Sequence, residues 1–257
     1  MINLKNKVDI EGIRKAGIVV RTVLDELGKI TLAGLATKKY NETAEEIAAS
    51  MNAMPAFKGY RGFPYAVCVS INEEVVHGFP SDKKLREGDI VSLDFGSYYE
   101  GYYADAAITL PVGEISEKAA NLIKVTKEAL NIGISRARVG NRLYDISSAI
   151  EDYVTKHGYS VVRDFVGHGI GYELHEDPQV PNYVVKNYDV PLEDGLVIAI
   201  EPMVNEFSHK IRVKKNHWTV IAADKGLSAH FEHTVAITKE GPYILTEAGE
   251  SWQKKKT

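Results

Sequence analysis

Apolar residues recur at helical spacing in four stretches of the chain. The first covers residues 9–27, and a second helix is predicted to begin near Thr43, which has the spacing of a capping box with Glu46. A third begins after Ser116, a residue suited to capping a helix, and the fourth covers residues 143–157. The pattern therefore predicts two helices in each half of the chain.

Shorter apolar or alternating segments predict strands between and after these helices. They cover residues 65–71, 89–111, 160–166, 196–204, 211–222 and 230–238. Short turns join most of them, which favours an antiparallel α+β fold over alternating βαβ units. Each half reads as two helices followed by several strands, without a repeat at the level of residues. Since no linker separates the halves, we expect residues 1–257 to form one domain with two similar lobes.

Two aspartates stand on the arms of a predicted hairpin within residues 89–111. If Tyr99 and Glu100 form its loop, Asp94 lies directly opposite Asp105. If the loop is Glu100 and Gly101, the two aspartates are diagonal neighbours on the same face. Like charges at such distances repel each other, so either register is unfavourable without a positive centre between the carboxylates.

Two glutamates occupy other strand-like segments. Glu201 lies in the apolar run 195–204, where a carboxylate must be paired, protonated or bound to a metal. A salt bridge to Arg163 or Arg212 is an alternative explanation. Glu232 projects from an alternating strand, on the face opposite its apolar side chains, where a solvent-exposed acid is the ordinary explanation.

His168 is surrounded by the alternating glycines of residues 167–171. A dinucleotide-binding loop is excluded for two reasons. Tyr172 stands where the G-x-G-x-x-G fingerprint needs its third glycine, and no strong helix follows. Glycines around a histidine instead let the backbone pass close to a ligand. His77 and His175 precede turns, where each alone would be an ordinary surface histidine.

Five side chains therefore form a candidate ligand set of four carboxylates and one imidazole: Asp94, Asp105, His168, Glu201 and Glu232. A set of oxygens and one nitrogen, without thiolate, suits hard or intermediate divalent ions such as Mn²⁺, Fe²⁺ or Co²⁺. Four carboxylates carry more charge than one divalent ion neutralises, which favours two ions. Paired ions of this kind activate water for hydrolysis.

Composition places further limits on function. The 257 residues carry 31 basic and 35 acidic side chains, a net charge of -4 that argues against a general nucleic-acid or membrane-surface binder. Cys68 is the single cysteine, so no internal disulfide is expected. The N-terminus lacks a signal-peptide pattern and no run of 18 apolar residues occurs, so a cytoplasmic location is expected.

The sequence resembles the type I methionine aminopeptidases over nearly its whole length. The resemblance is carried, in order along the chain, by residues 59–64, 67–73, 76–78, 92–96, 103–107, 167–171, 174–178, 200–203 and 231–234. It implies the pita-bread fold, a pseudo-twofold α+β domain with a dinuclear metal centre. It also implies removal of the N-terminal methionine from nascent proteins and peptides when the second residue is small, by a hydroxide that the two metals activate.

The resemblance also implies individual roles. Asp94 would bind one ion, His168 and Glu201 would complete the other, and Asp105 and Glu232 would bridge both. Glu201 would also accept a proton.

Two histidines outside the ligand set receive roles as well. His175 would stabilise the developing oxyanion, and His77 would contact the scissile amide or its leaving nitrogen. The methionine pocket would be lined by four residues: Tyr60, Phe63, Cys68 and Trp218. Leu174 departs from the phenylalanine common in bacterial relatives. The expected partner is a nascent-chain or peptide N-terminus, with transient ribosome association, no membrane contact and a monomeric enzyme.

Two other classes of protein are rivals. Aminopeptidase P and prolidase share the fold and ligands but cleave next to proline, and they usually carry a large N-terminal domain. Only 76 residues precede His77 here. A non-enzymatic relative that binds protein or RNA would have lost ligands, and this chain has all five. Type II enzymes carry a helical insertion, for which the segment between Glu201 and Glu232 has no room.

Overall fold

The computed structural model describes residues 2–247. Within them lie four α-helices, α1 (Lys7–Lys29), α2 (Lys38–Ser50), α3 (Glu117–Arg136) and α4 (Leu143–Lys156), and one 3-10 turn, Tyr60–Gly62. The strands are β1 (Met54–Pro55), β2 (Cys68–Ile71), β3 (Glu74–Val76), β4 (Ile90–Tyr99), β5 (Tyr102–Pro111), β6 (Ser160–Val161), β7 (Gly167–Gly169), β8 (Glu176–Val180), β9 (Val197–Ile200), β10 (Met203–Asn205), β11 (Ile211–Val213), β12 (Val220–Ala222), β13 (Ser228–His230), β14 (Glu232–Thr238) and β15 (Gly241–Ile244). None of the helices described has the length and apolarity needed to cross a bilayer.

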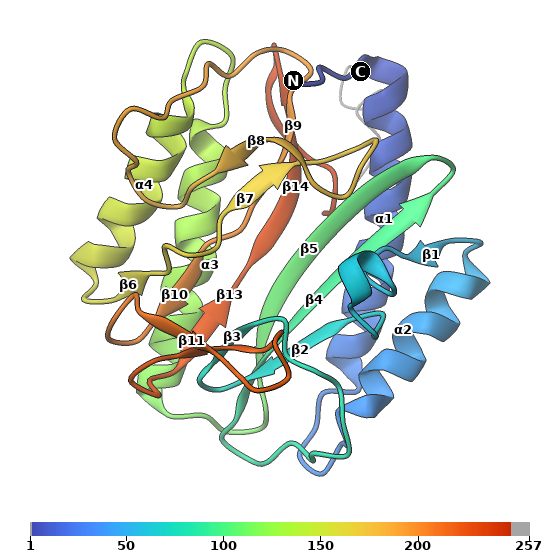
Figure 1. The fold of residues 1–257 in the computed structure, drawn as a ribbon, viewed down its shortest axis with the longest axis vertical. Helices are drawn as coiled ribbons and strands as arrows, with labels where there is room; N and C mark the ends of the chain where they lie inside the picture. The colour runs from blue at the N-terminus through green and yellow to red at the C-terminus, as the bar shows by residue number, and fades with distance from the viewer. Residues whose placement is uncertain (1, 248–257) are drawn as a thin grey trace.

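The strands form one large sheet and two small ones, and every pair is antiparallel. The large sheet has the order β1-β4-β5-β14-β9-β7-β8, with β2 beside β4 and β15 beside β14. The small sheets have the orders β13-β10-β6 and β11-β12-β3. In the view of Figure 1, α1 and α2 lie on the right of the strands and α3 and α4 on the left. The predicted antiparallel α+β fold is confirmed, with two helices in each half.

Each pair of helices buries an apolar face against its part of the sheet. One core includes Ile13, Val20 and Leu27 of α1, which pack with Phe95 of β4. The other joins α3 and α4 to β9 and β14, around residues such as Ile146. Burial of these apolar side chains is the main force that holds the helices on the sheet. The two cores leave the central strands between them.

The start of the third helix is predicted correctly, because its cap coincides with the start of the apolar stripe. Ser116 accepts a hydrogen bond from the amide of Ala119 and caps α3, as predicted. The prediction that the second helix begins near Thr43 is wrong, because α2 begins at Lys38 and Thr43 lies inside it. Tyr40 is fully buried, and its contact with the core extends the helix by a turn toward the N-terminus.

The predicted strand over 196–204 is interrupted at Glu201 and Pro202. Proline has no amide hydrogen to donate to a ladder, so β9 ends at Ile200 and β10 begins at Met203 in another sheet. Because Glu201 lies in this break, the direction of its side chain is not set by the regular alternation of a strand. The strands predicted at 211–222 and 230–238 are likewise each divided, and the strand predicted at 160–166 is reduced to β6. Strands β1, β3, β7, β8 and β15 were not predicted.

The β4–β5 hairpin resolves the two registers that the sequence left open. Tyr99 pairs with Tyr102, so Glu100 and Gly101 form the loop. Both loop residues have positive φ, 47° and 94°, as two-residue hairpin turns of type I′ require. Asp94 therefore pairs with Ala107, and the two aspartates are diagonal neighbours on one face of the hairpin.

Candidate metal centre

The structure brings all eleven predicted site residues to one cavity. They are Tyr60, Phe63, Cys68, His77, Asp94, Asp105, His168, His175, Glu201, Trp218 and Glu232, and they share its walls with Phe57, Arg61 and Leu174. The cavity opens to solvent and has a volume of about 150 Å³. The cavity is thus lined by carboxylates, imidazoles and aromatic rings together.

Three of the carboxylates are placed by the register of the central strands. Ala107 of β5 pairs with Asp94 of β4 on one side and with Glu232 of β14 on the other. These three positions form a row across the sheet, and their side chains project from the same face. Asp105 lies two residues along β5 on that face. The small side chain of Ala107 leaves the space between the carboxylates open.

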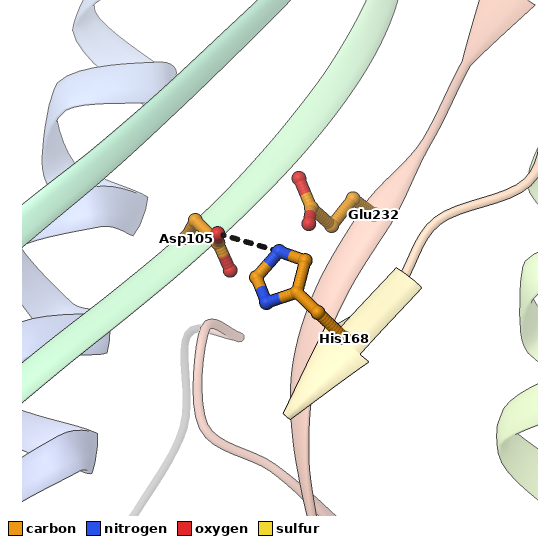
Figure 2. Close-up of side chains that lie close together, drawn as sticks. All are labelled: Asp105, His168 and Glu232. Carbon is orange, nitrogen blue, oxygen red and sulfur yellow. Dashed lines mark ion pairs between the residues drawn. The ribbon is translucent and has the colours of Figure 1, made fainter. Parts of the chain in front are cut away.

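His168 enters this group from β7. Its Nδ1 lies 2.9 Å from the carbonyl oxygen of Gly169, an acceptor that fixes the proton on Nδ1. Its Nε2 therefore presents a lone pair toward Asp105 Oδ2 at 3.5 Å and Glu201 Oε1 at 3.6 Å. Figure 2 shows the imidazole directed at Asp105, with Glu232 beside them. A ring oriented by a backbone carbonyl in this way is typical of metal ligands.

The burial of these groups tests whether a cation fits among them. Asp105 and Glu232 are each 3% exposed, and ligand atoms from these two residues and His168 lie within 4.8 Å of one another. Oδ1 of Asp94 is buried without a hydrogen-bond partner. Burial, together with repulsion from Asp105, raises the pKa of Asp94 well above its ordinary value, and burial does the same for Glu232. A divalent ion would offset both the cost of burying these carboxylates and the repulsion between them, so the residues fit a metal site.

The alternative for Glu201, a salt bridge to an arginine, is not found in residues 2–247. Arg163 pairs with Glu151, and Arg212 donates to the carbonyl of Ala223. The described ion-pair contacts of Glu201 are with two histidines, His168 among them. Burial, with repulsion from the aspartates, raises the pKa of this glutamic acid well above its ordinary value.

The other two predicted histidines border the ligand group. His77 is half-buried against Phe165 and Trp218, and burial lowers its pKa to about 4, so its ring is neutral at neutral pH. His175 stands at the exposed mouth, stacked on Tyr60 with ring centroids 5.1 Å apart. Loss of water around its ring, followed by repulsion from His168, lowers the pKa of His175 as well.

An aromatic wall adjoins the carboxylates. The rings of Phe63 and Trp218 meet edge to face at 5.2 Å, and Leu174 is buried beside the cavity. Cys68 of β2 pairs with Asp94 of β4 and is 4% exposed. Burial, then repulsion from Asp94, raises the pKa of the Cys68 thiol well above its ordinary value. The thiol is therefore a packing group and a poor nucleophile.

Known proteins show the same arrangement of sequence and fold. The model described as Metallopeptidase family M24 matches residues 11–239. A methionine aminopeptidase of Clostridium acetobutylicum is 51% identical over 247 residues, which are 96% of this chain and 99% of that protein. A crystal structure of a methionine aminopeptidase from Thermotoga maritima has a TM-score of 0.94 at 46% identity, covering 96% of this chain and 100% of the other. The chain belongs to metallopeptidase family M24.

Within M24, the chain belongs to the methionine aminopeptidases, and its fold is the pita-bread fold expected from the resemblance. Membership implies the use of divalent metal. A prolidase of Pyrococcus furiosus shares the fold with a TM-score of 0.77 at 26% identity, and this chain covers 66% of that longer protein. This M24 peptidase is thus more similar to these methionine aminopeptidases than to that prolidase, in sequence, in fold and in length.

Two residues of this M24 peptidase that sequence reasoning missed also reach the site. Thr234 accepts a hydrogen bond from the amide of Asp105 and lies 3.2 Å from Asp105 Oδ1. His230 is 2% exposed, and its Nε2 lies 3.7 Å from Glu201 Oε2. Burial lowers the pKa of His230 to about 3. Each lies two residues from Glu232 in the sequence. Because residues two apart on a strand share a face, this spacing could have indicated that both point toward the site.

Proposed function

We propose that this M24 peptidase removes the N-terminal methionine from nascent proteins and peptides whose second residue is small. The observation that carries the proposal is one cavity in which five ligand side chains adjoin the aromatic wall of Phe63 and Trp218. Such a cavity combines the chemistry of hydrolysis with a surface suited to a thioether side chain. The relatives named methionine aminopeptidase, which match nearly the whole chain, support the same function.

The residues that would hold metal are Asp94, Asp105, His168, Glu201 and Glu232, and we propose two divalent ions of Co, Mn or Fe. The negative charge of four carboxylates supports the number two, and the absence of thiolate from the set supports the choice of metals. Such ions lower the pKa of water and polarise the scissile carbonyl.

We propose that a side chain of the protein, that of Glu201, acts as the general base. The side chain of Glu201, one of the five residues of the ligand group, is 13% exposed, and we propose that it also accepts the proton of the attacking water. Asn182 donates from Nδ2 to the backbone carbonyl of Glu201 at 3.1 Å, which holds this segment beside the break in the strand. The general base thus stands on a fixed backbone.

His175 would stabilise the oxyanion as a neutral donor. Nδ1 of His175 lies 3.0 Å from the hydroxyl of Tyr60. When Tyr60 donates to Nδ1, the imidazole carries its proton on Nε2, which can donate to the oxygen of the tetrahedral intermediate. His77, neutral and half-buried, would contact the scissile amide or its leaving nitrogen.

The preference for a small second residue is part of the proposal. His77 and His175 both line the cavity, so a large side chain next to the scissile bond would have to displace one of the rings. We further propose a cytoplasmic monomer that meets its substrates as nascent chains, with transient association with the ribosome. A nascent-chain substrate is the reason to expect this location.

Peptide hydrolysis tests the proposal directly. The metal-free protein is reconstituted separately with Mn²⁺, Fe²⁺ and Co²⁺ and given Met-Ala-Ser, Met-Leu-Ser and Ala-Pro-Ala. The proposal requires cleavage of Met-Ala-Ser, much slower cleavage of Met-Leu-Ser and none of the proline peptide. Cleavage of the proline peptide alone would assign an aminopeptidase P activity instead, and cleavage of none with any metal would favour a binding protein.

A further inference from the structure

His230 is a buried polar side chain that the proposed mechanism does not use. It ends β13, directly before the strand that carries Glu232, and is 2% exposed. Its Nε2 has no hydrogen-bond partner, and the nearest acidic group is Oε2 of Glu201 at 3.7 Å. A buried polar atom without a hydrogen-bond partner is unfavourable. Native structures rarely retain such an atom without a reason.

The backbone of His230 is fixed on two sides. Its amide donates to Oγ1 of Thr109 at 2.9 Å, and that hydroxyl lies 2.8 Å from the carbonyl oxygen of His230. In the small sheet, His230 pairs with Met203, which lies two residues after Glu201. The imidazole is therefore held beside the segment that connects Glu201 to β10.

The two oxygens of Glu201 face different imidazoles. Oε1 lies 3.6 Å from His168 Nε2, within the ligand group, whereas Oε2 lies 3.7 Å from His230 Nε2, outside it. A movement of about 0.7 Å would bring Oε2 and His230 to ordinary hydrogen-bond distance. Oε1 would then remain directed at the metal centre.

We propose that His230 is a positioning residue for Glu201, donating a hydrogen bond from Nε2 to Oε2 and leaving Oε1 for the metal. The inference rests on the proposed function, in which Glu201 is both ligand and proton acceptor. A neutral donor suits this place, because it orients the carboxylate without adding positive charge that would repel a divalent ion. Outer partners of metal ligands commonly change metal affinity by 10- to 100-fold.

The test compares two amides that differ in reach. In His230→Gln the amide nitrogen can occupy the place of Nε2, whereas in His230→Asn it is too short to reach Oε2. His233→Leu is the matched control, a largely buried histidine whose Nδ1 contacts Thr246. It removes a comparable contact without touching the cavity lining.

Two readouts are needed, Mn²⁺ affinity of the metal-free protein by titration calorimetry and kcat and KM for Met-Ala-Ser at saturating Mn²⁺. We expect His230→Asn to weaken Mn²⁺ binding about tenfold and lower kcat 10- to 100-fold, with KM within about threefold of the wild type. His230→Gln should restore both to within about threefold, and the His233 variant should leave Mn²⁺ affinity unchanged.

Three results would overturn the inference. One is wild-type affinity and turnover in His230→Asn, and another is a glutamine variant no better than the asparagine variant. A third is the loss of one bound Mn²⁺ per chain in both variants, which would make His230 a ligand. If the wild type does not cleave Met-Ala-Ser, the proposed function fails separately, and the Mn²⁺ affinities still decide whether His230 positions Glu201.

Discussion

Nε2 of His168 lies 3.5 Å from Oδ2 of Asp105, although two strands separate the strands that carry them. His168 stands on β7 and Asp105 on β5, with β14 and β9 between them. On a flat sheet three strand spacings amount to about 14 Å, more than these two side chains can bridge. The sheet must curl at this point, and the curl brings together candidate ligands from both halves of the chain.

The first prediction concerns the candidate ligand carboxylates. Asp94→Asn and Glu232→Gln should each abolish detectable hydrolysis of Met-Ala-Ser and reduce bound metal, because each removes a buried anion that faces the others. Metal content is measured by atomic absorption after reconstitution and desalting. Glu100→Gln, at the exposed tip of the same hairpin, should behave as the wild type. Wild-type metal content and turnover in either ligand variant would show that the centre is misassigned.

The second prediction concerns the aromatic wall. Trp218→Ala should raise KM for Met-Ala-Ser about tenfold while kcat changes less than threefold, because it removes apolar contact rather than a reacting group. A tenfold change corresponds to about 1.4 kcal/mol. Phe207→Ala removes an exposed aromatic ring outside the cavity lining and should leave KM unchanged. Steady-state kinetics would contradict the pocket assignment if Trp218→Ala left KM at the wild-type value.

The third prediction concerns a buried ion pair behind His175. Lys5 pairs with Glu176, their side chains are 1% and 4% exposed, and Oε1 of Glu176 accepts from the amide of Tyr172 at 2.7 Å. Lys5→Met should lower the free energy of unfolding by about 3–5 kcal/mol, because it leaves a buried carboxylate unpaired. Urea unfolding measures the change.

Two further variants check that explanation. Adding Glu176→Gln to Lys5→Met should restore part of the lost stability, since no buried charge then lacks a partner. Lys15→Met breaks an exposed pair with Glu100 and should change the free energy of unfolding by less than about 1 kcal/mol. Equal effects of the two lysine substitutions would contradict the role assigned to burial.

The fourth prediction concerns alkaline stability. Burial raises the pKa of Tyr40 to about 12 in the folded protein, against about 10 when unfolded. Its contribution to stability is therefore complete below pH 10 and is lost as the pH rises toward 12, because only the unfolded state releases the proton easily. At pH 8, Tyr40→Phe should be less stable by about 1 kcal/mol, through loss of the hydrogen bond to Thr31.

Between pH 9 and 12 the stability of the wild type should fall by about 2–3 kcal/mol relative to that of Tyr40→Phe, which lacks the titrating group. Urea unfolding at pH 8, 9.5, 11 and 12 follows the difference. Tyr144→Phe, at an exposed tyrosine, should keep a constant difference from the wild type across the same range. A constant difference for Tyr40→Phe as well would refute the predicted linkage.

Much of the fold could be predicted from the sequence because caps and apolar periodicity act locally. Ser116 caps its helix as predicted, whereas the start of α2 depends on the burial of Tyr40, which is a tertiary contact. Pro202 interrupts the predicted strand, which is a local effect of its sequence, and Glu201 lies in that interruption with its side chain in the cavity. The sequence therefore predicts the presence of an element more accurately than the residues at which it begins and ends.

The candidate site shows the same division. Asp94 and Asp105 were predicted to meet because a hairpin constrains its own arms, and only the turn at Glu100 and Gly101 decided their register. His230 was not predicted, because whether a strand histidine is buried depends on what covers that face. A single sequence predicts which side chains of a strand share a face, but it does not identify the elements that pack against that face.

The curl of the large sheet has a consequence for how the peptidase is made. Its first two candidate ligands, Asp94 and Asp105, precede α3, and the other three follow α4. A ribosome that stops anywhere before residue 232 therefore releases a polypeptide with at most four of the five. Catalytic competence would therefore arise late in synthesis, and no product truncated before residue 232 would have the complete ligand set.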